Sequence, residues 1–349
     1  MLISVIIPSY NSEKTIQKTI LSIKNQQGLE KNPEIIVVDD GSKDGTLKLL
    51  NQMDGIRVIT QKNSGPATAR NNGAKIANGD ILAFTDSDTV PHKDWLKNLT
   101  SPFENNDIVA TTGTYSIENK ESKLAQLIQS EIEYKHSKYK DFIAFGGTYN
   151  LAIRKNMFEQ IGGFNEDYKN ASGEDVDICY KIINKGYKIR FVKDAVVGHF
   201  HPENLYKYLK TQLNHGFWRV KLYFDHPNKV TGDDYTGSRE IIETLLAGFF
   251  IISPFIFVCP KPQFFKEGCL PKADNGIFKC LSFLPIISLL FIEYSFVSKL
   301  YSNRFKSKNN LPSKPISAII ISLRAIFRTF GFIKGIILFM PTTINHSKS

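Results

Sequence analysis

The sequence predicts an α/β fold with a doubly wound, mostly parallel sheet, followed by hydrophobic or amphipathic helices toward the C-terminus. Over the first 115 residues, short apolar runs alternate with amphipathic stretches in the order β-α-β-α. Some of these runs are continuous and β-branched, such as Ile-Ile-Val-Val at residues 35–38. A strand buried on both faces of a parallel sheet requires such a run. After about residue 231 the composition becomes apolar and basic.

The first half of the sheet is expected to contain four strands and three helices. The strands are Ile3–Pro8, Glu34–Asp39, Ile56–Thr60 and Ile81–Thr85, and the helices lie near Glu13–Gln26, Asp44–Gln52 and Pro66–Ala77. The second half is mixed, with strands near Ile108–Tyr115, Thr148–Ile153 and Lys188–Val197 and helices near Glu121–Lys138, Glu174–Lys185 and Glu203–Phe224. We therefore expect one domain over residues 1–230, built from halves 1–115 and 116–230, and a helical region over residues 231–349.

The positive charge is concentrated in the C-terminal part of the chain. The net charge is +10, and residues 241–349 contribute most of it with 13 Lys and Arg against 4 Asp and Glu. The first 240 residues are nearly neutral, with 31 against 30. A nucleic-acid-binding domain would be basic throughout, whereas a neutral body with a basic, apolar tail favours a membrane surface. We expect a membrane partner and no nucleic acid.

Three apolar segments make up this tail, at Ile241–Val258, Ile277–Val297 and Ile316–Met340. The first two are just long enough for a spanning helical hairpin, and the charges inside the third favour a helix lying in the membrane interface. Ordinary buried core helices are the alternative. Because Lys and Arg cluster between the second and third segments and the first strand has no signal peptide before it, the positive-inside bias predicts a body on the cytoplasmic side of the cell membrane. The basic residues of this cluster are Lys299, Arg304, Lys306, Lys308 and Lys314.

Two acids, Asp86 and Asp88, directly follow the strand expected at Ile81–Thr85. Alternation along an extended chain would point both side chains the same way, with Ser87 turned aside. Such hard oxygen ligands suit Mg²⁺ or Mn²⁺, which keeps its other positions for water and substrate phosphates. A solvated turn is the alternative, but open α/β sheets bind their ligands at the carboxyl ends of the strands. We interpret the pair as a divalent metal site.

The first strand ends in a second candidate contact region. Pro8 is expected to stop ladder pairing and to present Ser9 and Tyr10 at the ligand edge. There a hydroxyl and an aromatic ring could hold a nucleoside. A simple helix cap at Asn11 or Ser12 is equally compatible with this sequence.

The second strand and the third helix add further candidates for nucleotide contacts. Asp39 and Asp40 could accept hydrogen bonds from a uracil-type imide N–H or a ribose hydroxyl, although Asp40-Gly41 could also be a plain turn. Arg70 lies in a helix of small residues that starts at Pro66. Its permanent cation could pair with a diphosphate, or it could be an ordinary surface arginine.

Two groups in the second half complete the candidate site. Glu174 and Asp175 open a predicted helix, where the helix field would keep a carboxylate ionised and ready to accept a proton. A capping box that begins at Ser172 explains the same residues without a catalytic role. His199 and His201 follow the last strand two residues apart and could offer an imidazole to the metal, or they could be structural.

Taken in order, these motifs resemble glycosyltransferase family 2, the inverting nucleotide-sugar enzymes with an A-type nucleotide-diphospho-sugar transferase fold. The matching pieces span residues 3 to about 187: VIIPSYN, VVDDGSKDGT, NSGPATARNNGA, FTDSD, GGTYNLAIRK, IGGFNED and GEDVDICYKI. The resemblance implies that residues 1–115 bind the nucleotide sugar and that residues 116–230 bind the acceptor.

The resemblance also implies a role for each candidate. Asp88, with Asp86, would hold Mg²⁺ or Mn²⁺ on the donor diphosphate. Asp175, with Glu174 beside it, would be the general base that deprotonates the acceptor hydroxyl, so that the anomeric centre inverts in one displacement. The nucleotide would be held by Pro8, Ser9, Tyr10, Asp39, Asp40, Arg70 and Asp86.

One departure from the family predicts transfer of a single sugar. Processive members carry Q-x-x-R-W on a membrane-proximal helix, whereas residues 212–219 read QLNHGFWR. The apolar tail resembles that of members acting on lipid-linked or cell-envelope glycans, so a glycan or lipid-linked acceptor is expected. A nucleotidyltransferase of related fold and a catalytically silent binding subunit are the alternatives. A dinucleotide oxidoreductase is disfavoured because no G-x-G-x-x-G follows the first strand.

Overall fold

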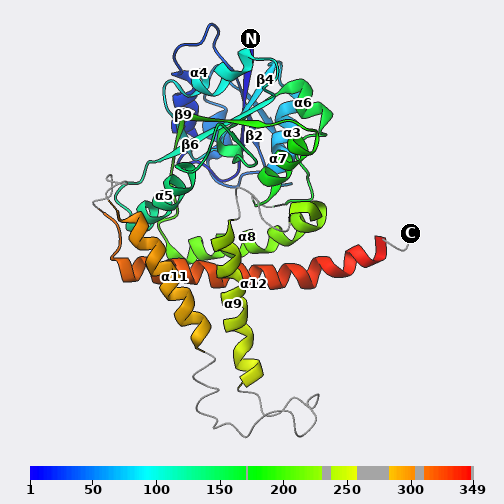
Figure 1. The fold of residues 1–349 in the computed structure, drawn as a ribbon. Coiled ribbons are helices and arrows are strands. Elements are labelled where there is room, and N and C mark those ends of the chain that lie inside the picture. The colour runs from blue at the N-terminus through cyan, green and yellow to red at the C-terminus, as the bar shows by residue number, and fades with distance from the viewer. Residues whose placement is uncertain (170–171, 230–236, 258–282, 303–309, 347–349) are drawn as a thin grey trace, which may run out of the picture. The chain divides into compact units, whose positions relative to one another are not determined.

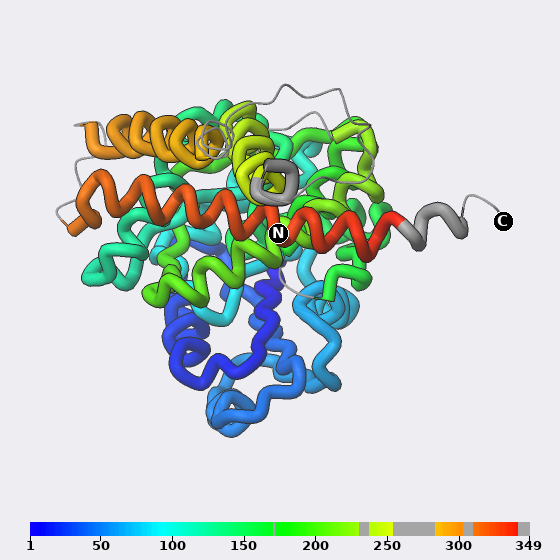
Figure 2. The backbone as a smooth tube through the Cα atoms, turned by 90° about the horizontal axis from the view of Figure 1, so that it is seen from below, coloured from blue at the N-terminus to red at the C-terminus, as the bar shows by residue number. Residues whose placement is uncertain are grey.

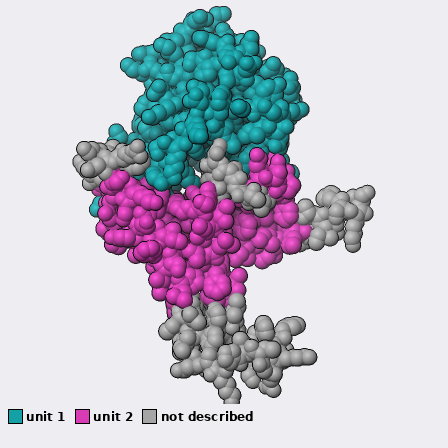
Figure 3. Space-filling model, in the orientation of Figure 1, with its two compact units in different colours: residues 1–202 teal, residues 203–349 magenta. Residues whose placement is uncertain are grey.

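The computed structural model describes residues 1–169, 172–229, 237–257, 283–302 and 310–346 (Figure 1). The chain divides into two compact units, which we call unit 1 (Met1–Pro202) and unit 2 (Glu203–Ser349) (Figure 3). The expected boundary near residue 230 therefore moves to residue 202, because helix α8 (Leu205–Asp225) packs along the last helix of unit 2.

Unit 1 contains a mixed sheet in the order β3-β2-β1-β4-β8-β6-β9-β5, with β7 paired to β9. The first half is parallel, as predicted. Its strands are β1 (Ile3–Ser9), β2 (Glu34–Asp39), β3 (Arg57–Thr60) and β4 (Ile81–Phe84). The second half adds antiparallel pairs through β5 (Thr89–Pro91), β6 (Ala110–Ile117), β7 (Phe142–Ile143), β8 (Leu151–Arg154) and β9 (Ile189–His199). The α/β class is confirmed.

Helices cover both faces of this sheet, and strand alternation divides the core accordingly. On β1, Ile6 packs into one apolar cluster while Val5 and Ile7 pack into the other. The cluster of Ile6 includes residues of α3 (Pro66–Ile76), α6 (Lys155–Gln160) and α7 (Glu174–Asn184). The other cluster includes residues of α1 (Ile16–Lys24), α2 (Thr46–Leu50) and α4 (Trp95–Thr100). In the described part of unit 1, one further α-helix is α5 (Lys123–His136).

Several local elements differ from the sequence prediction. Pro8 does not end its strand: β1 continues to Ser9 opposite β2, while its pairing with β4 stops at Ile6. Pro8 therefore lies where β1 has one neighbour, and a missing N–H is tolerated there. The short edge strand β5, which pairs with β9, is not among the strands expected from the sequence. The strand expected from Thr148 begins only at Leu151, after a 3₁₀ turn.

Unit 2 contains α8, α9 (Ser238–Phe257), α11 (Leu284–Leu300) and α12 (Lys314–His346). Along α8 and α12 the backbones approach closely at Gly216, Gly331 and Gly335, where an added Cβ would meet backbone atoms of the other helix. Figure 2 shows α12 as one long helix, and α9 and α11 cross it in Figure 1. The three helices share an apolar contact through Ala247, Leu289 and Ala325.

The structure revises the expectation for the apolar tail. Among the described residues, only the part of α12 at Lys314–Met340 is long and apolar enough to cross a membrane, and half of it is buried within the protein. The two segments expected to span, now α9 and α11, do not meet this criterion over their described lengths. Part of the expected basic cluster, including Arg304, Lys306 and Lys308, lies outside the described residues.

Candidate active site

The Asp86–Asp88 segment forms a turn, not the end of a strand. Because β4 ends at Phe84, the expected alternation of the two carboxylates does not apply. The side chain of Asp86 pairs with Arg70, whereas that of Asp88 faces His199. The two acids still interact, because the charge of Asp86 is one of the factors that raise the pKa of Asp88, after burial by the surrounding protein.

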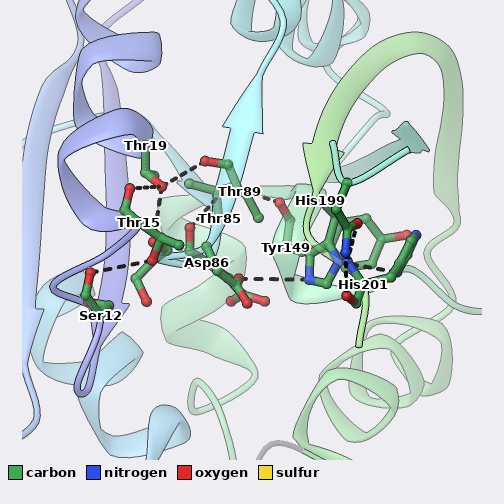
Figure 4. Close-up of polar contacts among 12 residues, drawn as sticks. Ser12, Thr15, Thr19, Thr85, Asp86, Thr89, Tyr149, His199 and His201 are labelled. Carbon is green, nitrogen blue, oxygen red and sulfur yellow. Dashed lines mark hydrogen bonds and ion pairs between the residues drawn. The ribbon is translucent and has the colours of Figure 1, made fainter. Parts of the chain in front are cut away.

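Three buried threonine hydroxyls hold this turn in place (Figure 4). Thr19 of α1 donates to the carbonyl oxygens of Ser87 and Thr89 at 3.1 and 2.7 Å. The hydroxyl of Thr89 lies 2.7 Å from the carbonyl oxygen of Asp86 and 2.8 Å from the hydroxyl of Thr85. Thr85 in turn donates to the carbonyl oxygen of Tyr149 at 2.8 Å. The turn is thus connected both to α1 and to the second half of the sheet.

Asp88 and His199 have a geometry that fits two ligands of one metal ion. His199 Nε2 lies 3.7 Å from Asp88 Oδ1, and two ligands at about 2.1 Å from an octahedral ion are about 3 Å apart. Within the described ranges, no three His, Cys, Asp or Glu side chains gather closely enough to hold a metal by themselves. Mg²⁺ and Mn²⁺ commonly take one or two protein ligands and complete their shell with water and substrate phosphates, so this donor set suits them.

The two histidines have different surroundings. His201 is buried, with Nε2 at 2.9 Å from the Gln129 side-chain oxygen and Nδ1 at 3.3 Å from His199 Nδ1. Burial, followed by the nearby His199, lowers the pKa of His201 to about 3. Both nitrogens of His201 lie within hydrogen-bond distance of other side chains, and metal binding by His201 stays a prediction. His201 holds the ring of His199, whose other nitrogen faces Asp88.

Arg70 joins two acidic motifs that are far apart in the sequence. Its guanidinium, 3% exposed, donates to Asp86 Oδ1 at 2.8 Å and to Glu174 Oε1 at 3.0 Å. The second oxygen of Glu174 accepts from the backbone N–H of Ser172 at 2.8 Å. Both oxygens of Glu174 are therefore engaged, and the N-cap of α7 is Gly173, so Ser172 does not form the capping box considered above. Arg70 links the Asp86–Asp88 turn to the start of α7.

Asp175 is the acid in this group with properties of a general base. Burial raises its pKa to about 7, as does the negative charge of Glu174, while the Val176 N–H and Arg70 oppose the rise. Asp86 also raises it, which shows that the two acids are within electrostatic reach. A base whose pKa lies near neutral pH combines a useful ionised fraction with a strong tendency to take a proton.

Tyr115 lies among all three candidate acids. Its ring stacks on that of Tyr149 with centroids 3.4 Å apart. Burial raises the pKa of Tyr115 well above its usual range, with further contributions from Tyr149, Asp86, Asp88 and Asp175. The phenol of Tyr115 on β6 therefore lies within electrostatic reach of Asp86 and Asp88 and also of Asp175, the candidate base. We conclude that the fold brings Asp88 and Asp175 to the same region of unit 1.

The expected nucleotide contacts fall into two groups. Tyr10 is 46% exposed and Asp39 Oδ1 is buried with no hydrogen-bond partner among the described residues. Ser9, in contrast, is buried with its hydroxyl 2.5 Å from that of Ser12. Asp40 accepts hydrogen bonds from the Gln61 side chain and from the backbone N–H groups of Ser64 and Gly65. Asp40 therefore fixes the loop before α3. The carboxylate with an oxygen that accepts no hydrogen bond from the described residues is that of Asp39.

Sequence reasoning missed the threonines, the tyrosine pair and Asn150. The fully buried Asn150 side chain donates to the carbonyls of Thr114 and Ala195 and accepts from the Trp95 indole. These partners are distant in the sequence, so no local pattern indicates them. Only Thr85 and Thr89 had a visible signal, because they flank the acidic motif.

Comparison with known proteins agrees on the class, a glycosyltransferase. The pattern of "Glycosyl transferase family 2" matches residues 4–162, and that of "N-terminal domain of galactosyltransferase" matches residues 128–203. The chain belongs to glycosyl transferase family 2.

Individual relatives are also glycosyltransferases. The chain is 30% identical to glycosyltransferase AglE of Haloferax volcanii over 63% of this chain and 74% of that protein. It is 31% identical to the UDP-Glc:alpha-D-GlcNAc-diphosphoundecaprenol beta-1,3-glucosyltransferase WfaP of Escherichia coli over 54% of this chain and 73% of that protein. The chain spans about half the length of some other curated relatives that it matches.

One solved structure resembles the chain over most of its length. Mannosyltransferase PcManGT of Pyrobaculum calidifontis, in complex with GDP-Man and Mn²⁺, superimposes with a TM-score of 0.52 at 16% identity. The match covers 92% of this chain and 86% of that one, and it supports the fold. The relatives favour a glycosyltransferase over the nucleotidyltransferase considered from the sequence.

Proposed function

We propose that this protein is an inverting glycosyltransferase that moves a single sugar from a nucleotide-diphosphate donor to a hydroxyl of a glycan or lipid-linked acceptor. It uses Mg²⁺ or Mn²⁺ and the general base Asp175, and it works at the cytoplasmic face of the cell membrane. The observation that carries the proposal is the ionic bridge from Asp86 through Arg70 to Glu174. This bridge joins the Asp86–Asp88 turn to α7, the helix that bears Asp175.

The donor base would meet Tyr10 and Asp39. The unpartnered buried oxygen of Asp39 is an acceptor suited to the imide N–H of a uracil or the N–H of a guanine. The exposed ring of Tyr10 offers a face on which a base can stack. Asp40 and Ser9 would support this region through their hydrogen bonds to neighbouring loops. Relatives named for UDP-Glc or solved with GDP-Man are compatible with either base.

The metal would be held by Asp88 and His199, with Asp86 close by and His201 orienting the ring of His199. A bound divalent cation supplies positive charge that offsets the charge growing on the leaving diphosphate. PcManGT, solved with Mn²⁺, supports a divalent ion. Because Arg70 is already paired with two carboxylates, we assign it to positioning these acids and not to the diphosphate.

Asp175 would accept the proton of the acceptor hydroxyl. As that proton leaves, the hydroxyl oxygen bonds to the anomeric carbon and the bond from this carbon to the diphosphate oxygen breaks. Attack opposite the leaving group inverts the anomeric centre. Glu174, bonded through both oxygens, keeps the helix start in place and adds negative charge that raises the pKa of Asp175.

The acceptor and the location are inferred from a relative and from the composition of the C-terminal helices. The relative WfaP is named for an acceptor carried on diphosphoundecaprenol, which supports a lipid-linked acceptor here. The apolar helix α12 and the basic C-terminal composition support membrane attachment.

A screen of nucleotide sugars tests the donor assignment. Purified full-length protein with Mn²⁺ is incubated with UDP- and GDP-sugars, and binding is read by thermal shift. We expect one donor class to stabilise the protein, and we expect metal removal by EDTA to abolish most of the shift. Slow release of nucleoside diphosphate should accompany binding. If no nucleotide sugar shifts the melting temperature with metal present, the proposed activity is wrong.

A further inference from the structure

Helix α9 exposes its apolar residues and buries its charged one. Among the described side chains of this helix, the large exposed ones are Ile242, Leu245, Phe249 and Ile252, spaced by three and four residues on a single helical face. Leu245 is 68% exposed, whereas Glu243 on the opposite face is 2% exposed. A water-facing helix has the reverse polarity.

Helix α11 repeats this arrangement with the same spacing. Leu284, Ile287, Phe291 and Tyr294 are exposed, Phe291 to 75%, and Glu293 is fully buried. Exposed apolar side chains also occur on α12, at Ile316, Ile319, Phe330, Ile336, Ile337, Leu338 and Met340. Together these residues form an apolar exterior of a size that soluble monomers rarely expose.

The same helices contain a cluster of ion-paired residues between them. Arg324 of α12 donates to Glu243 of α9 at 3.0 Å. Arg239 of α9 lies 3.0 Å from the other oxygen of Glu243 and 3.4 Å from Glu293 of α11. Arg239 also lies 3.7 Å from Glu240 of the same helix, so the cluster contains two arginines and three glutamates. Ionisable residues in membrane-embedded helices face the interior of the helix group and pair with each other.

The positions of the cations indicate which ends of α9 and α11 would enter the lipid. Arg239 lies at the start of α9 and Lys299 at the end of α11, while the exposed apolar residues of α11 lie toward its other end. From Thr244 to Phe257, α9 has no charged residue. Those 14 residues cover about 21 Å at 1.5 Å per residue, compared with a hydrocarbon core of about 30 Å.

Helix α12 differs from α9 and α11 because it packs along a polar helix. Gly331 and Gly335 contact the backbone of α8, and Arg328 Nε donates to Gln212 of α8 at 2.7 Å. Its exposed Lys314 and Lys334 suit anionic headgroups. These contacts favour a position of α12 at the level of the headgroups.

We propose that the exposed apolar faces of α9 and α11 contact the acyl chains of an anionic lipid bilayer, with α12 lying in the interface beside them. This inference rests on the membrane attachment in the proposed function and assigns that attachment to particular faces. The occupant is lipid and not a second copy of the chain, because an excess of 9 positive charges over residues 241–349 complements anionic headgroups and would repel an identical unit.

Flotation with vesicles tests the proposal. Full-length protein is mixed with vesicles of phosphatidylcholine and phosphatidylglycerol and centrifuged through a density gradient. A double variant, Leu245→Glu with Phe249→Glu, should bind the vesicles about a hundredfold more weakly, because two carboxylates would enter the hydrocarbon. The matched control is Leu21→Glu in unit 1, since Leu21 is 46% exposed and Phe249 47%. This control should float like the unmodified protein.

The depth of α9 in the bilayer is measured from the fluorescence of one added tryptophan. Phe249→Trp should be quenched by lipids brominated in the middle of their acyl chains, whereas Leu21→Trp should not. Quenching of the unmodified protein, whose Trp95 and Trp218 are buried, gives the background. Equal flotation of the double variant and the control would overturn the proposal, as would Phe249→Trp fluorescence that brominated lipid leaves unchanged.

Donor binding separates this proposal from the proposed function. The double variant should keep the Mn²⁺-dependent thermal shift with nucleotide sugar, which shows that unit 1 is folded. Lost flotation with intact donor binding supports the membrane assignment. Unmodified protein that binds donor but does not float overturns only the membrane assignment. If the double variant instead converts a dimer into a monomer in size-exclusion chromatography, the apolar faces bind a second copy and the proposal is wrong.

Discussion

Replacing Glu174 by Gln should extend activity to lower pH. In the unmodified protein burial and the charge of Glu174 raise the pKa of Asp175 to about 7. A protonated Asp175 cannot accept a proton, so activity is present above this pKa and is lost as the pH falls through it. Glu174→Gln removes the negative neighbour and keeps the shape, so the pKa of Asp175 should fall.

The size of the shift follows from the position of the two acids. They are adjacent in the first turn of α7, and two charges about 6 Å apart at an effective dielectric constant of about 20 interact by about 3 kcal/mol. That is an upper value of about 2 pKa units, and we expect at least 1. With a pKa near 7, about a tenth of Asp175 is ionised at pH 6. A fall of 1 unit raises that fraction to about half, a fivefold gain.

The assay is the pH dependence of kcat/KM between pH 5 and 9 at saturating Mn²⁺, read as nucleoside diphosphate released. Arg70→Met should move the acidic limb in the opposite direction, because Arg70 lowers the pKa of Asp175. Arg70→Lys keeps the charge and should move the limb less. An acidic limb that stays near pH 7 in Glu174→Gln, or moves upward, would refute the assignment of Asp175 as the base.

Three further substitutions test the supports around the site and in unit 2. Thr89→Val removes a hydroxyl that holds the acidic turn, so the Mn²⁺ concentration for half-maximal activity should rise about tenfold; a change below twofold would count against this role. Asn150→Leu loses three hydrogen bonds of a buried side chain, including that from Trp95, and should cost about 3 kcal/mol or more in urea unfolding; a cost under 1 kcal/mol would contradict this role. Gly331→Ala would bring its Cβ to 1.9 Å from a carbonyl oxygen of α8 and should destabilise unit 2 by about 2 kcal/mol. Gly248→Ala, whose nearest neighbour lies at 3.7 Å, should be neutral in the same thermal unfolding experiment.

Local patterns were sufficient for the strands and helices of the first half of the sheet. Continuous β-branched runs and amphipathic helices are properties of short segments, and β1 to β4 lie within a few residues of their expected bounds. Elements as short as β5 and α6 have too few residues to show periodicity. The prediction for Pro8 was wrong because its effect depends on where the neighbouring strand ends.

The site shows a similar division. The acids could be found from the sequence because carboxylates at strand ends and helix starts form recognisable motifs. Their partners could not, because Arg70 meets Glu174 across 104 positions and His201 meets Gln129 across 72. The contacts therefore give Arg70, Asp40 and His201 partners that the sequence does not indicate, and the roles of Asp88 and Asp175 stay predictions.

A comparison of Asp88→Asn with Asp175→Asn tests the central claim most directly. Donor binding is measured by thermal shift with Mn²⁺, and turnover is measured on the same samples. We expect Asp88→Asn to abolish the metal-dependent part of the shift, and Asp175→Asn to leave the shift intact while turnover falls at least a thousandfold. Equal loss of donor binding in both variants, or substantial turnover by Asp175→Asn, would contradict the separation of metal site and base.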